Sequence, residues 1–136
     1  MNAANAINER WKGTLVEHLG IRFIEATPDR VVAELEIRDT LRTVGAGGQP
    51  GSLHGGTLMA FADSVGATGT VMSLQEGQST ATLESKTNFF AAGRSGIVRA
   101  EAKAIHKGKR THVWETRITD AGGKLLSLTL QTQMIL

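Results

Sequence analysis

The chain has 136 residues, the length of one ordinary domain, so we expect a single domain spanning residues 1–136 without a separate cofactor domain. A hydrophobic fraction of 40% and a charged fraction of 21% are typical of a folded globular domain. The absence of cysteine excludes disulfides, thiolate metal ligands and a cysteine nucleophile. Because aromatic residues make up only 4% of the chain, a base-stacking surface for single-stranded nucleic acid is not expected.

The net charge of +2 is unevenly distributed along the chain. Residues 1–93 carry seven Lys or Arg and ten Asp or Glu, whereas residues 94–136 carry eight and three. The basic C-terminal portion suits a phosphate-bearing ligand better than a DNA duplex, although a solvated face of strands and turns would have the same composition. No apolar run approaches about 18 residues and no signal-peptide pattern opens the chain, so we expect a cytoplasmic protein without membrane contact.

The first third of the chain predicts helix followed by a hairpin. Apolar residues recur at near-helical spacing over residues 3–19, with Gly13 as a candidate break and residues 1–14 as an N-terminal extension or helix. Residues 30–38 alternate strictly, which predicts a half-buried strand with Val31 and Leu35 on the buried face and Val32 on the other. A turn signal at residues 27–29 makes residues 21–26 the hairpin partner.

Glycine is the compositional outlier, at 16 residues, and six glycines lie within residues 45–56, which we expect to form a loop. Residues 57–73 predict a helix rich in small residues. Four alternating segments follow, separated by turn sequences, at residues 80–90, 97–106, 111–119 and 125–136. Consecutive strands with short turns predict an antiparallel meander. The helix is the only long element able to cover its face, so the fold class is α+β.

One side of the predicted central helix is nearly bare and carries a single carboxylate. At helical spacing this side comprises Gly56, Ala60, Asp63, Gly66 or Ala67, and Thr70. We expect the bare stripe to admit a ligand or a partner subunit. The opposite arc suits packing on a sheet because it carries Leu58, Phe61, Val65 and Met72.

Asp63 requires an explanation, because it is the only Asp, Glu, Lys or Arg between Arg42 and Glu76 and Asp has poor helix propensity. One interpretation makes it a general base or nucleophile. The other makes it a structural residue that caps a neighbouring loop or faces water. His54, Gly55 and Gly56 stand at the loop-to-helix junction, where free N–H groups stabilise an oxyanion. A helix N-terminus followed two turns later by a carboxylate contains the parts of an acyl-transfer site.

These residues resemble a known family. The segment LHGGTLMAFADSVGATG, with His54-Gly55-Gly56 followed by Asp63, is similar to the helix motif of hotdog-fold acyl-CoA thioesterases of the phenylacetate-degradation (PaaI-like) type. Residues 87–93 resemble the family's strand end, residues 105–109 its His-x-Gly-Arg bulge and residues 119–124 its last hairpin. The resemblance covers roughly residues 15–136 and implies a long helix wrapped by a curved antiparallel sheet.

The resemblance implies that two subunits join their sheets, that each active site lies at the dimer interface, and that two dimers form a tetramer. It implies that Asp63 is the catalytic carboxylate, that the Gly56 N–H, with Gly55 beside it, polarises the thioester carbonyl, and that His54 positions the loop or the thioester. Relatives often carry Asn or Gln six residues before the His; here Gln49 lies five before and takes that role.

The family often orients the attacking water with Ser or Thr four residues after the carboxylate, where this chain has Ala67. Ser64, Thr68 or a residue of the partner's strand 80–90 is the candidate replacement. The resemblance also implies substrate contacts at the strand end and at basic turns, where coenzyme A phosphates would bind. These candidates are Asn88, Phe89, Arg94, His106, Lys107, Lys109 and Arg110.

The expected activity is therefore hydrolysis of an acyl-CoA thioester, with no cofactor apart from the coenzyme A of the substrate and no nucleic-acid partner. No metal is expected, because the four histidines lack metal-ligand spacing. Two alternatives remain open. A hotdog protein can bind acyl-CoA without hydrolysing it, and the hydratase or dehydratase branch of the fold acts on enoyl-CoA.

Overall fold

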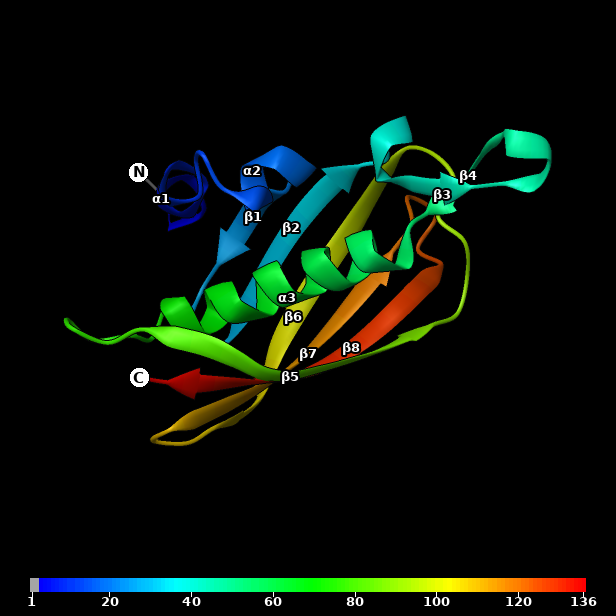
Figure 1. Cartoon of the computed structure of the whole chain (residues 1–136). Helices are drawn as coiled ribbons and strands as arrows, with labels where there is room; N and C mark the ends of the chain where they lie inside the picture. Colours follow the sequence, from blue (N-terminus) through cyan, green and yellow to red (C-terminus); the bar gives the residue numbers. More distant parts are fainter. Residues whose placement is uncertain (1–2) are drawn as a thin grey trace.

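A computed structural model describes residues 3–136 and shows a long helix, α3 (Gly55–Val71), lying across one face of an antiparallel sheet (Figure 1). The sheet has six strands in the order β1-β2-β6-β7-β8-β5. Their bounds are β1 Arg22–Ala26, β2 Arg30–Glu36, β5 Thr80–Phe89, β6 Ile97–Lys107, β7 Thr111–Thr119 and β8 Leu125–Ile135. The predicted α+β class and the helix-on-sheet layering are confirmed.

The predicted N-terminal helix is two helices, α1 (Ala3–Arg10) and α2 (Leu15–Leu19). The break falls where Gly13 takes a φ of +76°, a left-handed conformation that favours glycine. Asn8 fixes α1 to the sheet edge, because its side-chain amide donates to the Phe23 carbonyl at 3.1 Å and accepts the Phe23 N–H at 2.8 Å. Ile7 is buried in the same core as the sheet residues, so the N-terminal segment covers β1.

The hairpin β1–β2 forms as predicted, and Val31 and Leu35 are buried. Val32 is also fully buried, although the alternation placed it on the outer face. It pairs with Glu25 on β1 and Glu101 on β6. Arg30, two residues away on the same face, forms ion pairs with both carboxylates. The stems of these long side chains cover Val32.

The predicted four-strand meander is wrong in one connection. β6, β7 and β8 form a meander, but β5 pairs with β8 rather than β6, and β6 pairs with β2. Residues 90–96 therefore form a crossover rather than a hairpin turn. Gly93 fixes this crossover against the start of α3, because its carbonyl accepts the Leu53 N–H at 2.8 Å and it lies buried against Leu126. The consequence is that β5 occupies one edge of the sheet.

Much of the glycine-rich segment is a small hairpin rather than a loop. β3 (Arg42–Val44) pairs with β4 (Pro50–Leu53). The short 3-10 turn Asp39–Leu41 precedes β3, and a second one, Ala46–Gly48, joins the two strands. The strands approach so closely that a β-carbon on Gly51 would lie 2.8 Å from the Thr43 carbonyl oxygen. Figure 1 shows this hairpin projecting beyond the start of α3.

The arc of α3 that carries Leu58, Phe61 and Val65 packs on the sheet, as predicted. The predicted bare stripe is only partly correct, because Gly66 and Thr70 are buried against the sheet. A β-carbon on Gly66 would lie 2.2 Å from Gln131 Oε1 on β8, so this glycine admits a sheet side chain rather than a ligand. Ala60, Asp63 and Ala67 remain half-buried. Among residues 3–136, no helix has the length and apolar character needed to cross a membrane.

Candidate active site

His54 caps the first turn of α3. Its Nδ1 accepts the Gly56 N–H at 2.8 Å, and its carbonyl oxygen accepts the Thr57 and Leu58 N–H groups. Because Nδ1 is an acceptor, the neutral imidazole carries its proton on Nε2, where it can donate to a ligand. Within residues 3–136 the Gly55 N–H has no acceptor. The structure therefore leaves Gly55, rather than the predicted Gly56, as the free backbone donor at this helix terminus.

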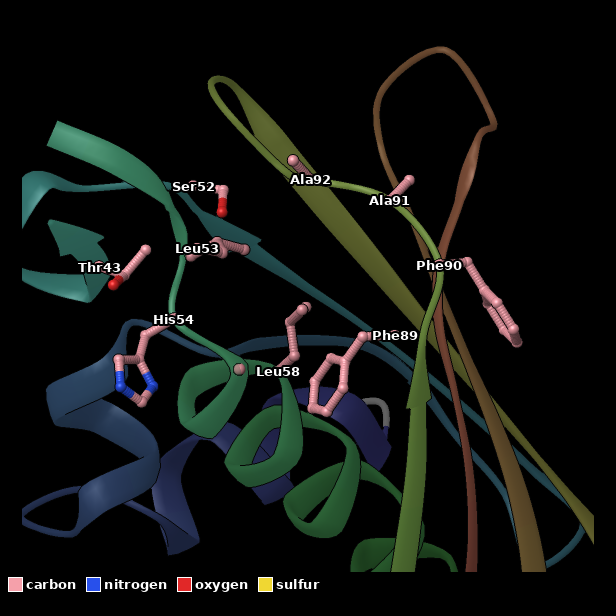
Figure 2. A pocket seen from close by; sticks show the side chains of 10 residues that line it. Thr43, Ser52, Leu53, His54, Leu58, Phe89, Phe90, Ala91 and Ala92 are labelled. Atoms are coloured by element: carbon pink, nitrogen blue, oxygen red, sulfur yellow. The ribbon is translucent and has the colours of Figure 1, made fainter. Parts of the chain in front are cut away.

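A cavity of about 480 Å³ opens at this terminus (Figure 2). His54 and Gly55 lie on one side of it, and the end of β5 and the crossover lie on the other. Phe89 points toward the helix start in Figure 2, whereas Phe90 points away. A β-carbon on Gly55 would lie 3.3 Å from the Phe89 ring. The lining is completed by Thr43, Ser52, Leu53, Leu58, Phe90, Ala91 and Ala92.

Asp63 lies two turns along α3 and is held by two side chains from the sheet. The Thr82 hydroxyl donates to Asp63 Oδ1 at 2.6 Å, and the Gln131 amide donates to the same oxygen at 3.2 Å. Among the described residues, Oδ2 has no partner. The carboxylate is half-buried, with one oxygen anchored and the other free.

The helix start and Asp63 are too far apart to act on one carbonyl within a single chain. Seven to eight residues of α-helix separate Gly55 and Gly56 from Asp63, which corresponds to about 10–12 Å along the axis. A carbonyl that accepts a hydrogen bond at about 3 Å must also meet its attacking group at about 3–3.5 Å. The backbone spacing between the two groups along α3 exceeds the sum of these two contacts.

The two hydroxyls of α3 that are candidates for orienting water donate to carbonyl groups of the helix itself. Ser64 donates to the Ala60 carbonyl at 2.7 Å, and Thr68 donates to the Ser64 carbonyl at 2.8 Å. Thr68 is fully buried, so the structure does not support a substrate contact for it. Thr82 is the hydroxyl that reaches Asp63 instead.

Two other predicted contacts lie away from the cavity. Gln49 lies at the exposed turn of the β3–β4 hairpin and does not line the cavity. Asn88 neighbours Phe89 on β5 and points to the opposite face, beside Leu128 and Leu130 of β8. Successive strand residues point to opposite faces, so only one of Asn88 and Phe89 can face α3.

The predicted basic group is divided between the two ends of the sheet. Arg94 lies in the crossover near the start of α3, whereas Lys107, Lys109 and Arg110 lie at the β6–β7 turn, as does His106. The 11 residues of β6 separate these ends by about 33 Å. Lys107 also donates to the Pro28 carbonyl at 3.0 Å and pairs with Asp29. These residues cannot contact one ligand from a single chain.

A polar cluster on the sheet face beneath α3 was not predicted. It consists of Thr80, Thr82, Gln131 and Gln133, and both glutamines are 1% exposed. Gln131 Nε2 donates to Gln133 Oε1 at 2.9 Å, and Gln133 Nε2 donates to Thr80 Oγ1 at 3.1 Å. The signal was present in the sequence, because Gln131 and Gln133 occupy inward positions of an otherwise regular strand. Among residues 3–136, no group of three or more His, Asp or Glu is placed to hold a metal ion.

Comparison with known proteins decides the family. Residues 50–127 match the family model described as Thioesterase superfamily. This chain belongs to the thioesterase superfamily. The resemblance read from the helix motif is thus confirmed, and the fold is the hotdog fold. As a member of this superfamily the protein is a thioester hydrolase.

Two curated relatives and one crystal structure illustrate the similarity. The thioesterase is 34% identical over 116 residues to a 1,4-dihydroxy-2-naphthoyl-CoA hydrolase of Listeria monocytogenes, covering 85% of this chain and 89% of that one. It is 34% identical over 120 residues to a proofreading thioesterase of Cronobacter turicensis, covering 88% and 83%. The crystal structure of a thioesterase from Haemophilus influenzae superposes with a TM-score of 0.90 at 26% identity, covering 100% of this chain and 92% of that one.

Proposed function

We propose that this thioesterase hydrolyses an acyl-CoA at sites shared between two chains, with Asp63 of one chain acting on a carbonyl held at the start of α3 of the other. The observation that carries the proposal is the separation of about 12 Å along the helix axis between the backbone of Gly55, whose N–H is free, and that of Asp63. A pair of antiparallel helices would place the helix start of each chain opposite Asp63 of the other.

The edge strand β5 supports this pairing. It is ten residues long, and an edge strand presents unpaired N–H and carbonyl groups that can join another strand. Its Leu83 is 59% exposed. The other edge, β1, has five residues and is held by Asn8 of α1. Pairing two β5 strands antiparallel would make a continuous sheet and run the two α3 helices in opposite directions.

The reaction would proceed as follows. The Gly55 N–H, at the positive end of α3, donates to the thioester oxygen and stabilises the negative charge that develops on it. Asp63 of the partner subunit removes a proton from water, which adds to the carbonyl carbon. Collapse of the adduct breaks the C–S bond, and the proton held by Asp63 passes to the leaving sulfur, so that the acid and the coenzyme A thiol are released and the carboxylate is restored. In the alternative course Asp63 attacks directly, the thiolate leaves, and water hydrolyses the resulting anhydride.

Pairing of two β5 strands would also bring basic residues of the two chains to the same end of the sheet. Antiparallel pairing would bring the crossover of one chain, with Arg94, to the same end of the joined sheet as the β6–β7 turn of the other, with Lys109 and Arg110. Arg and Lys suit the phosphates of coenzyme A. Association of two such dimers into a tetramer remains a prediction. The exposed Leu130 and Ile105 offer apolar surface for a second contact.

The activity is tested by following free-thiol release from aromatic, short-chain and long-chain acyl-CoAs. An aryl-CoA is the first substrate to assay, because the half-exposed Phe89 ring lines the cavity. Asp63→Asn should lower kcat by about 10²–10⁴-fold while acyl-CoA binding remains. Full activity of this variant would overturn the role of Asp63. Binding without thiol release would favour a binding protein, and loss of enoyl absorbance without thiol release would favour a hydratase.

The shared site is tested by mixing two inactive variants. Gly55→Pro removes the N–H at the first helical position, where proline is tolerated, and Gly55→Ala is its control because it adds a β-carbon but keeps the N–H. A mixed dimer of Gly55→Pro and Asp63→Asn chains contains one intact site. After subunit exchange the mixture should therefore recover about a quarter of wild-type activity. No recovery, with exchange shown by mass spectrometry, would contradict sharing between chains.

A further inference from the structure

Asp63 receives two hydrogen bonds on one oxygen and none on the other. We propose that Gln131 and Thr82 are positioning residues that anchor Oδ1 of Asp63 and so assign the reaction to Oδ2. The inference rests on the proposed function of Asp63 and goes beyond it, because it names which carboxylate oxygen reacts and which sheet residues select it. Both anchors come from the sheet, Thr82 from β5 and Gln131 from β8.

The contact with Asp63 fixes the orientation of the Gln131 amide. Its Nε2 lies 3.2 Å from Asp63 Oδ1, 3.3 Å from the Asp63 carbonyl oxygen and 2.9 Å from Gln133 Oε1. All three neighbours are oxygen atoms. A flipped amide would place Oε1 of Gln131 against these three oxygen atoms, with no hydrogen to form a bond to any of them. The NH₂ group must therefore face the carboxylate.

This orientation has a cost that argues for a role beyond stability. With the NH₂ group directed at Asp63 and Gln133, Gln131 Oε1 is buried and has no hydrogen-bond partner among the described residues. An unpaired buried acceptor destabilises the folded protein relative to a paired one. Oε1 fits only because α3 has glycine at position 66, where a β-carbon would lie 2.2 Å from it. An apolar side chain at position 131 would have no unpaired Oε1, but it could not donate to Asp63 and Gln133.

Thr82 completes the anchor and responds to the charge of Asp63. Its hydroxyl oxygen lies 2.6 Å from both Asp63 Oδ1 and Gln133 Oε1, but it carries a single proton. An ionised carboxylate is the stronger acceptor, so the proton is donated to Asp63 when Asp63 is charged. Oδ1 then holds two donors, and its partner-free neighbour Oδ2 is left to accept a proton from water or to attack carbon.

The test uses matched substitutions in the full-length protein. Thr82→Val removes the hydroxyl at constant shape, Thr82→Ser retains it, and Gln131→Met replaces the amide with an apolar chain of similar length. We expect Thr82→Val and Gln131→Met to lower kcat by about 10–100-fold with little change in KM, because a misplaced reacting group loses rate. Thr82→Ser should restore most of the activity.

Stability separates positioning from packing. Gln131→Met removes the unpaired Oε1 but also removes the donor to Gln133 Oε1, so one unpaired buried acceptor replaces another and the urea midpoint should stay close to that of wild type. Wild-type kcat in Thr82→Val and Gln131→Met would overturn the inference, as would a loss of kcat in Thr82→Val accompanied by an equal loss in Thr82→Ser. Asp63→Asn, measured in parallel, separates failure of the anchor from failure of the proposed function. If Asp63→Asn is active, the proposed function fails. If Asp63→Asn is inactive while Thr82→Val and Gln131→Met are fully active, only the anchor fails.

Discussion

The indole of Trp114 occupies the space that a side chain on Gly69 would fill, so that a β-carbon at Gly69 would lie 2.2 Å from the ring atom Cη2. Trp114 is fully buried on β7, and its Nε1 donates to the Thr70 hydroxyl on the next helical position at 2.9 Å. The glycine and the tryptophan together set how closely the second half of α3 approaches the sheet, and hence where Asp63 meets β5 and β8.

Gly69→Ala should destabilise the protein even though alanine is the better helix former. The substitution gains about 1 kcal/mol in helix propensity. The clash with Trp114 forces the helix or the ring to move, and such overpacking costs about 1–3 kcal/mol or more. We expect a lower urea midpoint. Gly122→Ala is the control, because a β-carbon there would meet nothing closer than 3.4 Å. An unchanged or higher midpoint in Gly69→Ala would show that the close approach is not maintained.

His112 makes the stability of this region depend on pH. The ring is 4% exposed, and its Nδ1 lies 3.0 Å from the Thr70 hydroxyl, which already accepts the Trp114 N–H. Burial lowers the pKa of His112 below its ordinary value of 6.5, and the positive charges of Lys107 and His106 lower it further. The unfolded chain therefore binds the proton more readily than the folded one. Stability is full above about pH 6.5 and declines as the pH falls from there toward the lower folded pKa.

The predicted pH dependence is measured as urea midpoints near pH 8 and near pH 5.5. The wild type should lose stability between them, and His112→Gln should lose less, because it has no proton to bind. His18→Gln replaces an exposed histidine on α2 and is the control, expected to show the wild-type slope. An identical slope in His112→Gln would mean that other groups account for the loss.

The fold could be predicted from local pattern because most of the sheet follows strict alternation and most of α3 follows helical spacing. The connection after β5 could not be predicted, because the composition of residues 90–96 is typical of a turn and suits both a hairpin between neighbouring strands and a crossover. Only the contact of Gly93 with Leu53 and Leu126, which are distant in sequence, decides it. Likewise Gly66 and Gly69 signal close approach, but the sequence does not say whether a ligand, a partner or a sheet side chain approaches.

The candidate site was predictable where its residues adjoin in sequence and not where they meet across the sheet. His54, Gly55 and Asp63 share one helix, so their spacing carries the signal. Thr82 and Gln131 reach Asp63 from strands 19 and 68 residues away. The preference for Gly55 over Gly56 as the free donor depends on the rotamer of His54, which no pattern of residues specifies.

His54 should have separable structural and chemical roles. His54→Ala loses the cap on the Gly56 N–H, which costs about 1 kcal/mol, whereas His54→Asn supplies a side-chain oxygen that caps equally well. Both variants lose the Nε2–H of an exposed residue that lines the cavity, so both should show lower kcat/KM, but only the alanine variant should unfold at lower urea. Wild-type kcat/KM in His54→Asn would show that the imidazole serves only as a cap.

The coenzyme A contacts predict a substrate-dependent effect of charge. Lys109 and Arg110 are exposed at the β6–β7 turn, about 33 Å along β6 from the crossover of their own chain. In the proposed dimer they would act on a substrate bound at the partner's helix start. Removing both charges, in K109A/R110A, should raise KM for an acyl-CoA at low salt and leave kcat unchanged. The effect should shrink at high salt, which screens exposed charges. An acyl-pantetheine, which lacks the nucleotide phosphates, should be hydrolysed equally well by variant and wild type. If KM for both substrates rises together, the turn does not bind phosphate and its charges influence the enzyme in another way.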